Sequence, residues 1–198
     1  MDNEERCNLI RSTIQAIPLD GSISVLTGSN GSGKSLVRSQ LNFRTRESGK
    51  NVVHASMAFR TGTHSHMGAL GSLVRDSDWM STSYETFKNI KTAIRSTHDN
   101  FLCLDEIEIG CSAETVMGMT HWLNANLKIG IEGSLGCLVI THSPHVVENL
   151  NFDHWFNLDG YASAEEWLHR EIVPVDMDSY VEQQMELFKM IRDRMKKD

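Results

Sequence analysis

Four short runs of apolar residues recur along the chain, and stretches with helical spacing of apolar positions lie between them. The runs cover residues 23–26, 52–57, 101–104 and 137–141. Several of them show no alternation of apolar and polar positions, which is typical of parallel strands covered on both faces. Strands that alternate with helices predict an α/β fold, with a mainly parallel sheet flanked by helices.

The last third of the chain carries two further helical signals. In the segment "SAEEWL", Ser163 and Glu166 have the spacing of a capping box, and Pro174 is expected to end the short helix that follows. Residues 178–196 have the spacing of an amphipathic helix, with an apolar stripe formed by Val181, Met185, Phe188 and Met195. We therefore divide the chain into a main domain, residues 1–176, and a C-terminal amphipathic helix, residues 177–198. The stripe packs on its own core or, in the alternative, on a partner subunit.

Length and composition set broad limits on the class of protein. The chain has 198 residues, of which 40% are hydrophobic and 23% charged, as in an ordinary globular domain that buries its own core. No apolar stretch approaches the roughly 20 residues that cross a membrane. The first residues, "MDNEERCNL", are acidic and polar, unlike a signal peptide.

Four cysteines, Cys7, Cys103, Cys111 and Cys137, form no CxxC pair. Two of them lie in apolar runs, so we expect reduced core residues in a cytoplasmic protein. The net charge of −7 argues against a nucleic-acid surface that spans the chain. The only dense basic stretches are residues 38–50 and 192–197, which predict weak, salt-sensitive nucleic-acid binding at most.

The segment "GSNGSGKS" follows the first apolar run and fits the phosphate-loop spacing G-x-x-x-x-G-K-[ST]. Its glycines allow a tight turn that points N–H groups inward, and the helix expected to begin near Lys34 adds its positive end. Lys34 is expected to reach the β- and γ-phosphates of ATP, and the Ser35 hydroxyl to ligate Mg²⁺. A flexible Gly/Ser linker is the alternative, but a linker would not require this spacing. The candidate nucleotide-binding residues of this segment are Gly28, Ser29, Asn30, Gly31, Ser32, Gly33, Lys34 and Ser35.

Two carboxylates end the third apolar run, in the segment "FLCLDEIEIG". At the carboxyl end of a parallel strand, Asp105 would lie beside the phosphate loop and hold Mg²⁺ directly or through water. Glu106 could orient or deprotonate the attacking water. The alternative is an acid pair that caps a helix after a buried strand.

The fourth run ends in the segment "VITHS", which places His142 directly after a strand. This histidine could contact the γ-phosphate or the catalytic water, whereas a lone histidine after a strand is more often structural. Lys34, Glu106 and His142 are the three candidate catalytic residues.

These three segments together resemble the ABC-type P-loop ATPases, a superfamily that includes transporter nucleotide domains and SMC, RecF and MutS-like heads. The resemblance covers about residues 20–150: "GSNGSGKS" is similar to their Walker A, "FLCLDE" to their Walker B with its adjacent glutamate, and "VITHS" to their switch-histidine segment. It implies a P-loop NTPase fold of ABC-ATPase type. Only 71 positions separate Lys34 from Asp105, which implies a reduced helical subdomain in a short stand-alone form.

In this family a signature segment completes the ATP site in trans. No S-G-G segment occurs here, but "MSTSYETFKNIKTAI", residues 80–94, is similar to the Ser-Thr pair that opens a helix in MutS proteins. The resemblance thus makes Ser81, Thr82 and Ser83 candidate nucleotide-binding residues across a dimer interface. The alternative is a plain N-cap at Ser81 or Ser83, with Glu85 in the first turn.

The function expected from these features is Mg²⁺-dependent ATP binding and hydrolysis, coupled to ATP-dependent homodimerisation or to a hetero-partner. The family suggests a separate effector or DNA-processing protein, in DNA metabolism or phage–host conflict. A nucleotide-dependent assembly subunit with slow hydrolysis is the second hypothesis. A small-molecule kinase is the third, for which residues 60–80 offer only Arg60 and Arg75 as lid cations.

Overall fold

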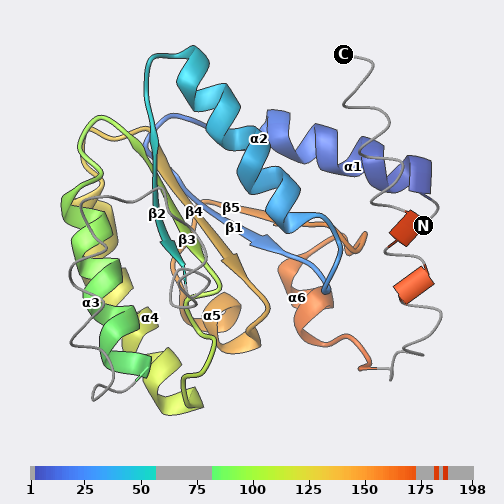
Figure 1. Ribbon diagram of the computed structural model, residues 1–198. Helices are drawn as coiled ribbons and strands as arrows, with labels where there is room; N and C mark the ends of the chain where they lie inside the picture. Colours follow the sequence, from blue (N-terminus) through green and yellow to red (C-terminus); the bar gives the residue numbers. More distant parts are fainter. Residues whose placement is uncertain (1–2, 57–81, 173–180, 183–184, 187–198) are drawn as a thin grey trace.

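The computed structural model describes residues 3–56, 82–172, 181–182 and 185–186 (Figure 1). Its centre is a parallel sheet of five strands in the order β2-β3-β4-β1-β5. The strands are β1 (Ile23–Thr27), β2 (Val52–Ser56), β3 (Phe101–Asp105), β4 (Gly136–Thr141) and β5 (His154–Asn157). The helices are α1 (Asn3–Ala16), α2 (Lys34–Glu47), α3 (Thr82–Arg95), α4 (Ala113–Gly130), α5 (Pro144–Asn149) and α6 (Ala164–Leu168).

Successive residues of the three central strands enter two different cores, one on each face of the sheet. Val25, Leu102 and Val139 belong to the core that α3 to α6 cover, and Leu26 and Cys103 to the core that α1 and α2 cover. Figure 1 shows α1 and α2 on one side of the sheet and α3 and α4 on the other. Burial on both faces explains why the runs that form β1, β3 and β4 lack polar alternation.

The strand order determines which side chains can meet at the carboxyl edge of the sheet. β4 lies between β1 and β3, with Thr27 opposite Thr141 and Asp105 opposite Ile140. Residues that follow β4 therefore lie between the loop after β1 and the carboxylates at the end of β3. This places His142 in the middle of the edge, although its sequence position is farthest from the loop.

The α/β fold with a mainly parallel sheet is confirmed, and each of the four predicted strands forms within one residue of its predicted ends. The fifth strand, β5, and the N-terminal helix α1 were not predicted. One half of the capping box is confirmed: Ser163 Oγ accepts a hydrogen bond of 3.0 Å from Glu166 N, whereas Glu166 Oε2 accepts from Ala162 N instead of Ser163 N. The helix it caps ends at Leu168, so Pro174, which lies outside the described residues, does not end it directly.

Of the C-terminal helix predicted for residues 177–198, only 181–182 and 185–186 lie in the described part of the chain, and they are helical. Val181 and Met185 are both exposed there. Within the described ranges, no helix combines the length and hydropathy needed to cross a bilayer. Cys103 and Cys137 are fully buried free thiols, and burial raises the pKa of both.

Candidate functional site

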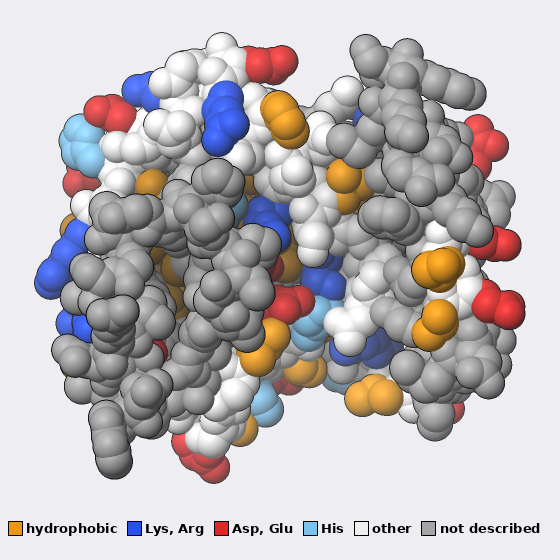
Figure 2. All heavy atoms as spheres, in the orientation of Figure 1, with side chains coloured by type: hydrophobic (Ala, Val, Ile, Leu, Met, Phe, Trp, Pro, Cys, Tyr) orange, Lys and Arg blue, Asp and Glu red, His pale blue; other side chains and the backbone are white. Residues whose placement is uncertain are grey.

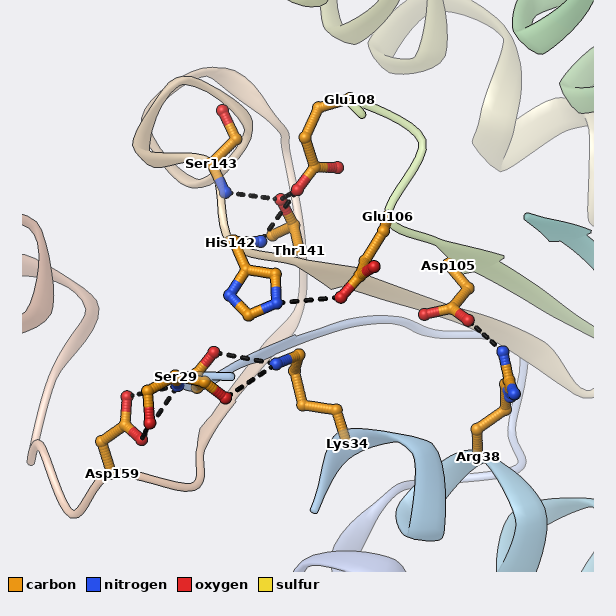
Figure 3. Close-up of polar contacts among 11 residues, drawn as sticks. Ser29, Lys34, Arg38, Asp105, Glu106, Glu108, Thr141, His142, Ser143 and Asp159 are labelled. Atoms are coloured by element: carbon orange, nitrogen blue, oxygen red, sulfur yellow. Dashed lines mark hydrogen bonds and ion pairs between the residues drawn. The ribbon is translucent and has the colours of Figure 1, made fainter. Parts of the chain in front are cut away.

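Lys34, Asp105, Glu106 and His142, all singled out in the sequence, meet at the carboxyl edge of the sheet together with Arg38, which was not (Figure 3). Lys34 and Arg38 extend from α2, Asp105 and Glu106 from the end of β3, and His142 from the end of β4. In the space-filling view, acidic, basic and histidine side chains meet in the middle of the face that contains this edge (Figure 2).

The loop of residues 28–33 turns tightly at two glycines between β1 and α2. Gly31 and Gly33 have φ angles of 75° and 109°, which only glycine adopts without strain. A Cβ atom on Gly33 would lie 2.4 Å from Ile10 Cδ1, so α1 packs closely against the loop. Within the described ranges, the backbone N–H groups of Gly31, Gly33, Lys34 and Ser35 have no protein acceptor. They therefore remain available for an anion at the N-terminus of α2.

Lys34 is folded back onto this loop. Its Nζ donates hydrogen bonds of 3.0 Å to both Gly28 O and Ser29 O, and the residue is 7% exposed. An ammonium group has three donors, so one remains for a phosphate oxygen. Burial lowers the pKa of Lys34, and the nearby carboxylates of Glu106, Asp159 and Asp105 oppose that shift by favouring the charged form.

Asp159, which follows β5, anchors the start of the loop at Ser29. Its carboxylate accepts hydrogen bonds from Ser29 N, at 2.8 and 2.9 Å, and from Ser29 Oγ, at 2.8 Å. Asn157 supports this arrangement: its Nδ2 donates to Thr27 Oγ1 at 3.0 Å and its Oδ1 accepts from Asp159 N at 2.8 Å. These hydrogen bonds connect the end of β5 to the end of β1 and to the first residues of the loop that follows β1.

Asp105 forms an ion pair with Arg38, whose Nη1 donates to Asp105 Oδ2. The Asp105 side chain is 13% exposed, and burial raises its pKa. Arg38 opposes that shift, and the neighbouring Glu106 adds to it. On the far side, His54 of β2 is held neutral, because burial and the Arg38 charge lower its pKa to about 4.

Glu106 and His142 are in direct contact, at 2.8 Å between Oε1 and Nε2. An ionised carboxylate only accepts hydrogen bonds, so Nε2 carries the hydrogen and donates it. Glu106 has a φ angle of 52°, a left-handed conformation that costs a non-glycine residue about 1–3 kcal/mol. The hydrogen bond from Glu106 N to Ile140 O, at 2.9 Å, holds the backbone in that conformation and aims the carboxylate toward His142.

Glu108 fixes the turn that carries His142. Its Oε1 accepts from Thr141 Oγ1 at 2.6 Å and from His142 N at 2.8 Å, and Thr141 Oγ1 accepts in turn from Ser143 N. Oε2 of Glu108 is buried without a hydrogen-bond partner in the described part of the chain. Glu108 therefore positions His142 by holding the backbone at the end of β4.

The signature-like residues are not brought to this site by the described structure. Ser81 lies outside the described residues, and Thr82 opens α3, as the sequence predicts for a helix start. Ser83 is half-buried. Ser35 is exposed at the start of α2, next to Lys34.

The described residues of this edge offer few ligands for a metal ion. No group of three or more His, Cys, Asp or Glu side chains that could hold a metal occurs within the described ranges. Mg²⁺ at phosphate sites takes only one or two protein oxygens and completes its shell with phosphates and water. Ser35 Oγ and the Asp105 carboxylate are the oxygens of this edge that suit it.

Three residues of the site were missed by the sequence analysis: Arg38, Glu108 and Asp159. Arg38 follows Lys34 by four residues, a spacing that places both on one face of a helix. Glu108 is the third acid of "DEIE", at the end of a predicted strand. Asp159 follows a strand that was not predicted, so no sequence signal connected it with the loop.

No known protein family matches the chain, and no curated protein does either. Among solved structures, it is similar to AMPPCP-bound DnaA from Aquifex aeolicus, at 11% identity and a TM-score of 0.45, covering 96% of this chain and 61% of that one. It is also similar to Cdc6p from Pyrobaculum aerophilum, at 13% identity and a TM-score of 0.38, covering 79% of this chain and 44% of that one. The ORC2 protein from Aeropyrum pernix is 15% identical, with a TM-score of 0.35, and the match covers 93% of this chain and 51% of that one. The chain thus spans less than two thirds of each of these proteins. Likenesses this distant assign neither a family nor an activity, and the ABC-type subclass stays a prediction.

The anchor formed by Asp159 leads to a stability prediction. Asp159→Ala removes the carboxylate that holds Ser29 N and Oγ, so we expect the free energy of unfolding to fall by about 1–2 kcal/mol. Urea denaturation at pH 7 measures this. The matched control is Glu132→Ala, which removes one exposed carboxylate at the end of α4. Equal stability of the two variants would show that the contact with Ser29 contributes nothing.

Proposed function

We propose that this protein is a P-loop ATPase that binds ATP with Mg²⁺ and hydrolyses it. The observation that carries the proposal is the contact between Glu106 and His142, at 2.8 Å, on the edge that also holds Lys34 and the free N–H groups of the loop. A phosphate loop alone supports binding. A carboxylate held by a histidine beside the loop adds a group that can take a proton from water.

Each group of the site has a separate role in the proposed reaction. The loop N–H groups and the remaining donor of Lys34 bind the phosphates and favour the charge that develops on them in the transition state. Glu106 orients the attacking water and accepts its proton as the oxygen bonds to the γ-phosphorus and the bond to the β-phosphate oxygen breaks. His142 holds the Glu106 carboxylate in place through Nε2–H, and Glu108 holds the His142 backbone.

When bound, Mg²⁺ neutralises negative charge on the phosphate oxygens. Ser35 and Asp105 are the residues that would hold it. Asp105 must exchange its contact with Arg38 for the ion or for one of its waters.

We expect Glu106→Gln to bind ATP as the wild type does, because the amide keeps the size and one acceptor oxygen of the carboxylate. Turnover should fall roughly a hundredfold or more, since the amide cannot accept a proton. A coupled phosphate-release assay and equilibrium binding of ATP measure the two quantities separately. Glu132→Gln, an exposed change of the same kind, serves as the control. Wild-type turnover in Glu106→Gln would show that another group activates the water.

The second candidate function is a nucleotide-dependent assembly subunit with slow hydrolysis. The ion pair between Arg38 and Asp105 favours it, because Asp105 must give up this partner before it can hold a metal ion. The wild-type turnover in the same assay separates the two candidates. The small-molecule kinase ranks lowest, and the residues it would use, Arg60 and Arg75, lie outside the described part of the chain.

We further propose that the ATPase acts with a second protein, either another copy of this chain or a separate effector or DNA-processing partner. The basic stretch 38–50 supports this, because three of its four cations already contact partners within the chain. Arg38 pairs with Asp105, and Arg44 donates to the carbonyl oxygens of Ile14 and Ile17. Assignment to the ABC-type subclass, with Ser81, Thr82 and Ser83 completing the site in trans, is a proposal from the sequence resemblance.

If the chain pairs with itself, Glu106→Gln should form dimers on addition of ATP and Mg²⁺, because bound ATP is not consumed. Adding Ser81→Arg to this variant should block the shift, since a bulky cation would occupy the proposed trans contact. Adding Ser96→Arg, at the other end of α3, should leave the shift intact. Sedimentation velocity with and without ATP measures the distribution. A monomer under all conditions would leave a hetero-partner as the only form of the proposal.

A further inference from the structure

Arg38 occupies a position that the proposed ATPase reaction does not use. It lies one turn after Lys34 on α2, so the two cations share one face of the helix and extend toward the carboxylates of β3 (Figure 3). Lys34 turns toward the phosphate loop, whereas Arg38 contacts Asp105. At this edge of the sheet, Lys34 thus contacts the loop and Arg38 contacts the end of β3.

The contact neutralises a buried charge. The Asp105 side chain is 13% exposed and directly precedes a second carboxylate, Glu106. Burying a carboxylate costs free energy unless a counter-charge lies beside it. Arg38 supplies one at every physiological pH, because a guanidinium group does not deprotonate in proteins.

A divalent cation would need the same carboxylate. Arg38 donates to Asp105 Oδ2, and its positive charge repels a second cation placed against the same group. Arg38 is itself 31% exposed, so its guanidinium can leave Asp105 for solvent without crossing the core. The phosphates of a nucleotide bring oxygen ligands and negative charge, which offset both the repulsion and the loss of the ion pair.

We propose that Arg38 is a placeholder cation, which neutralises Asp105 in the nucleotide-free protein and excludes divalent metal until nucleotide arrives. This rests on the proposed function in one respect, the assignment of Asp105 as a metal ligand. The consequence is an order of binding: metal enters with the nucleotide and not before it. Arg38 is therefore a positioning residue rather than a catalytic one.

The test uses Mn²⁺ alone, without nucleotide, and counts free Mn²⁺ by electron paramagnetic resonance in the presence of the full chain. Wild-type protein should bind Mn²⁺ weakly, and Arg38→Gln should bind one ion per chain about fivefold or more tightly, because the competing charge is gone. Arg46→Gln is the matched control, since Arg46 is an exposed cation on the same helix. Its Mn²⁺ affinity should equal that of the wild type. Adding Asp105→Asn to Arg38→Gln should abolish the gain.

Equal or weaker Mn²⁺ binding by Arg38→Gln would overturn the proposal and show that Arg38 merely orients Asp105. A measurement on the wild-type chain covers the case in which that variant does not fold, as judged by circular dichroism. In ¹⁵N-arginine NMR, the Arg38 Nε–H signal, assigned with Arg38→Lys, should shift on addition of Mg²⁺ with a non-hydrolysable ATP analogue and not with Mg²⁺ alone. A signal unchanged by Mg²⁺ with the analogue would contradict the proposal. Failure to bind any nucleotide would overturn the proposed function instead, while the Mn²⁺ titrations would still report on Arg38.

Discussion

The arrangement of the site depends on the parallel alignment of β1, β4 and β3, which brings three chain segments with opposite charges to one edge of the sheet. Lys34 and Arg38 of α2 face Asp105 and Glu106 at the end of β3. Each charge lowers the free-energy cost of burying the opposite charge beside it. Burial lowers the pKa of Lys34, and Glu106, Asp159 and Asp105 favour its charged form, while Asp105 is paired with Arg38. Removal of one member leaves an uncompensated charge in a half-buried setting, so the edge behaves as one electrostatic unit.

Backbone geometry is under strain at the residue that the proposed reaction depends on most. Glu106 adopts a left-handed conformation that glycine would adopt more easily, yet a glycine there would carry no carboxylate. The sheet stabilises this conformation through Glu106 N and Ile140 O, and Glu108 secures the opposite partner, His142. The strand ends thus hold a carboxylate and a histidine in contact.

Local sequence patterns predicted the parts of the fold that depend on local physics. The buried strands, the start of α2 at Lys34 and the N-cap at Ser163 each follow from residue types at fixed spacing, and each forms as expected. β5 was missed because it has only four residues and no extended apolar run. The contacts of Arg38 and Asp159 were missed because they join residues 67 and 130 positions apart. Such pairs are set by the strand order, which no local pattern encodes.

The central claim is that the loop of residues 28–35 binds the phosphates of ATP through Lys34 and its backbone N–H groups. It can be tested by calorimetric titration of a non-hydrolysable ATP analogue with Mg²⁺ into wild-type protein and Lys34→Ala. Arg46→Ala, which removes an exposed cation of the same helix, is the control. We expect one analogue per chain for the wild type and for Arg46→Ala, and an affinity lower by about tenfold or more for Lys34→Ala. No binding by the wild type, or equal affinity for Lys34→Ala, would contradict it.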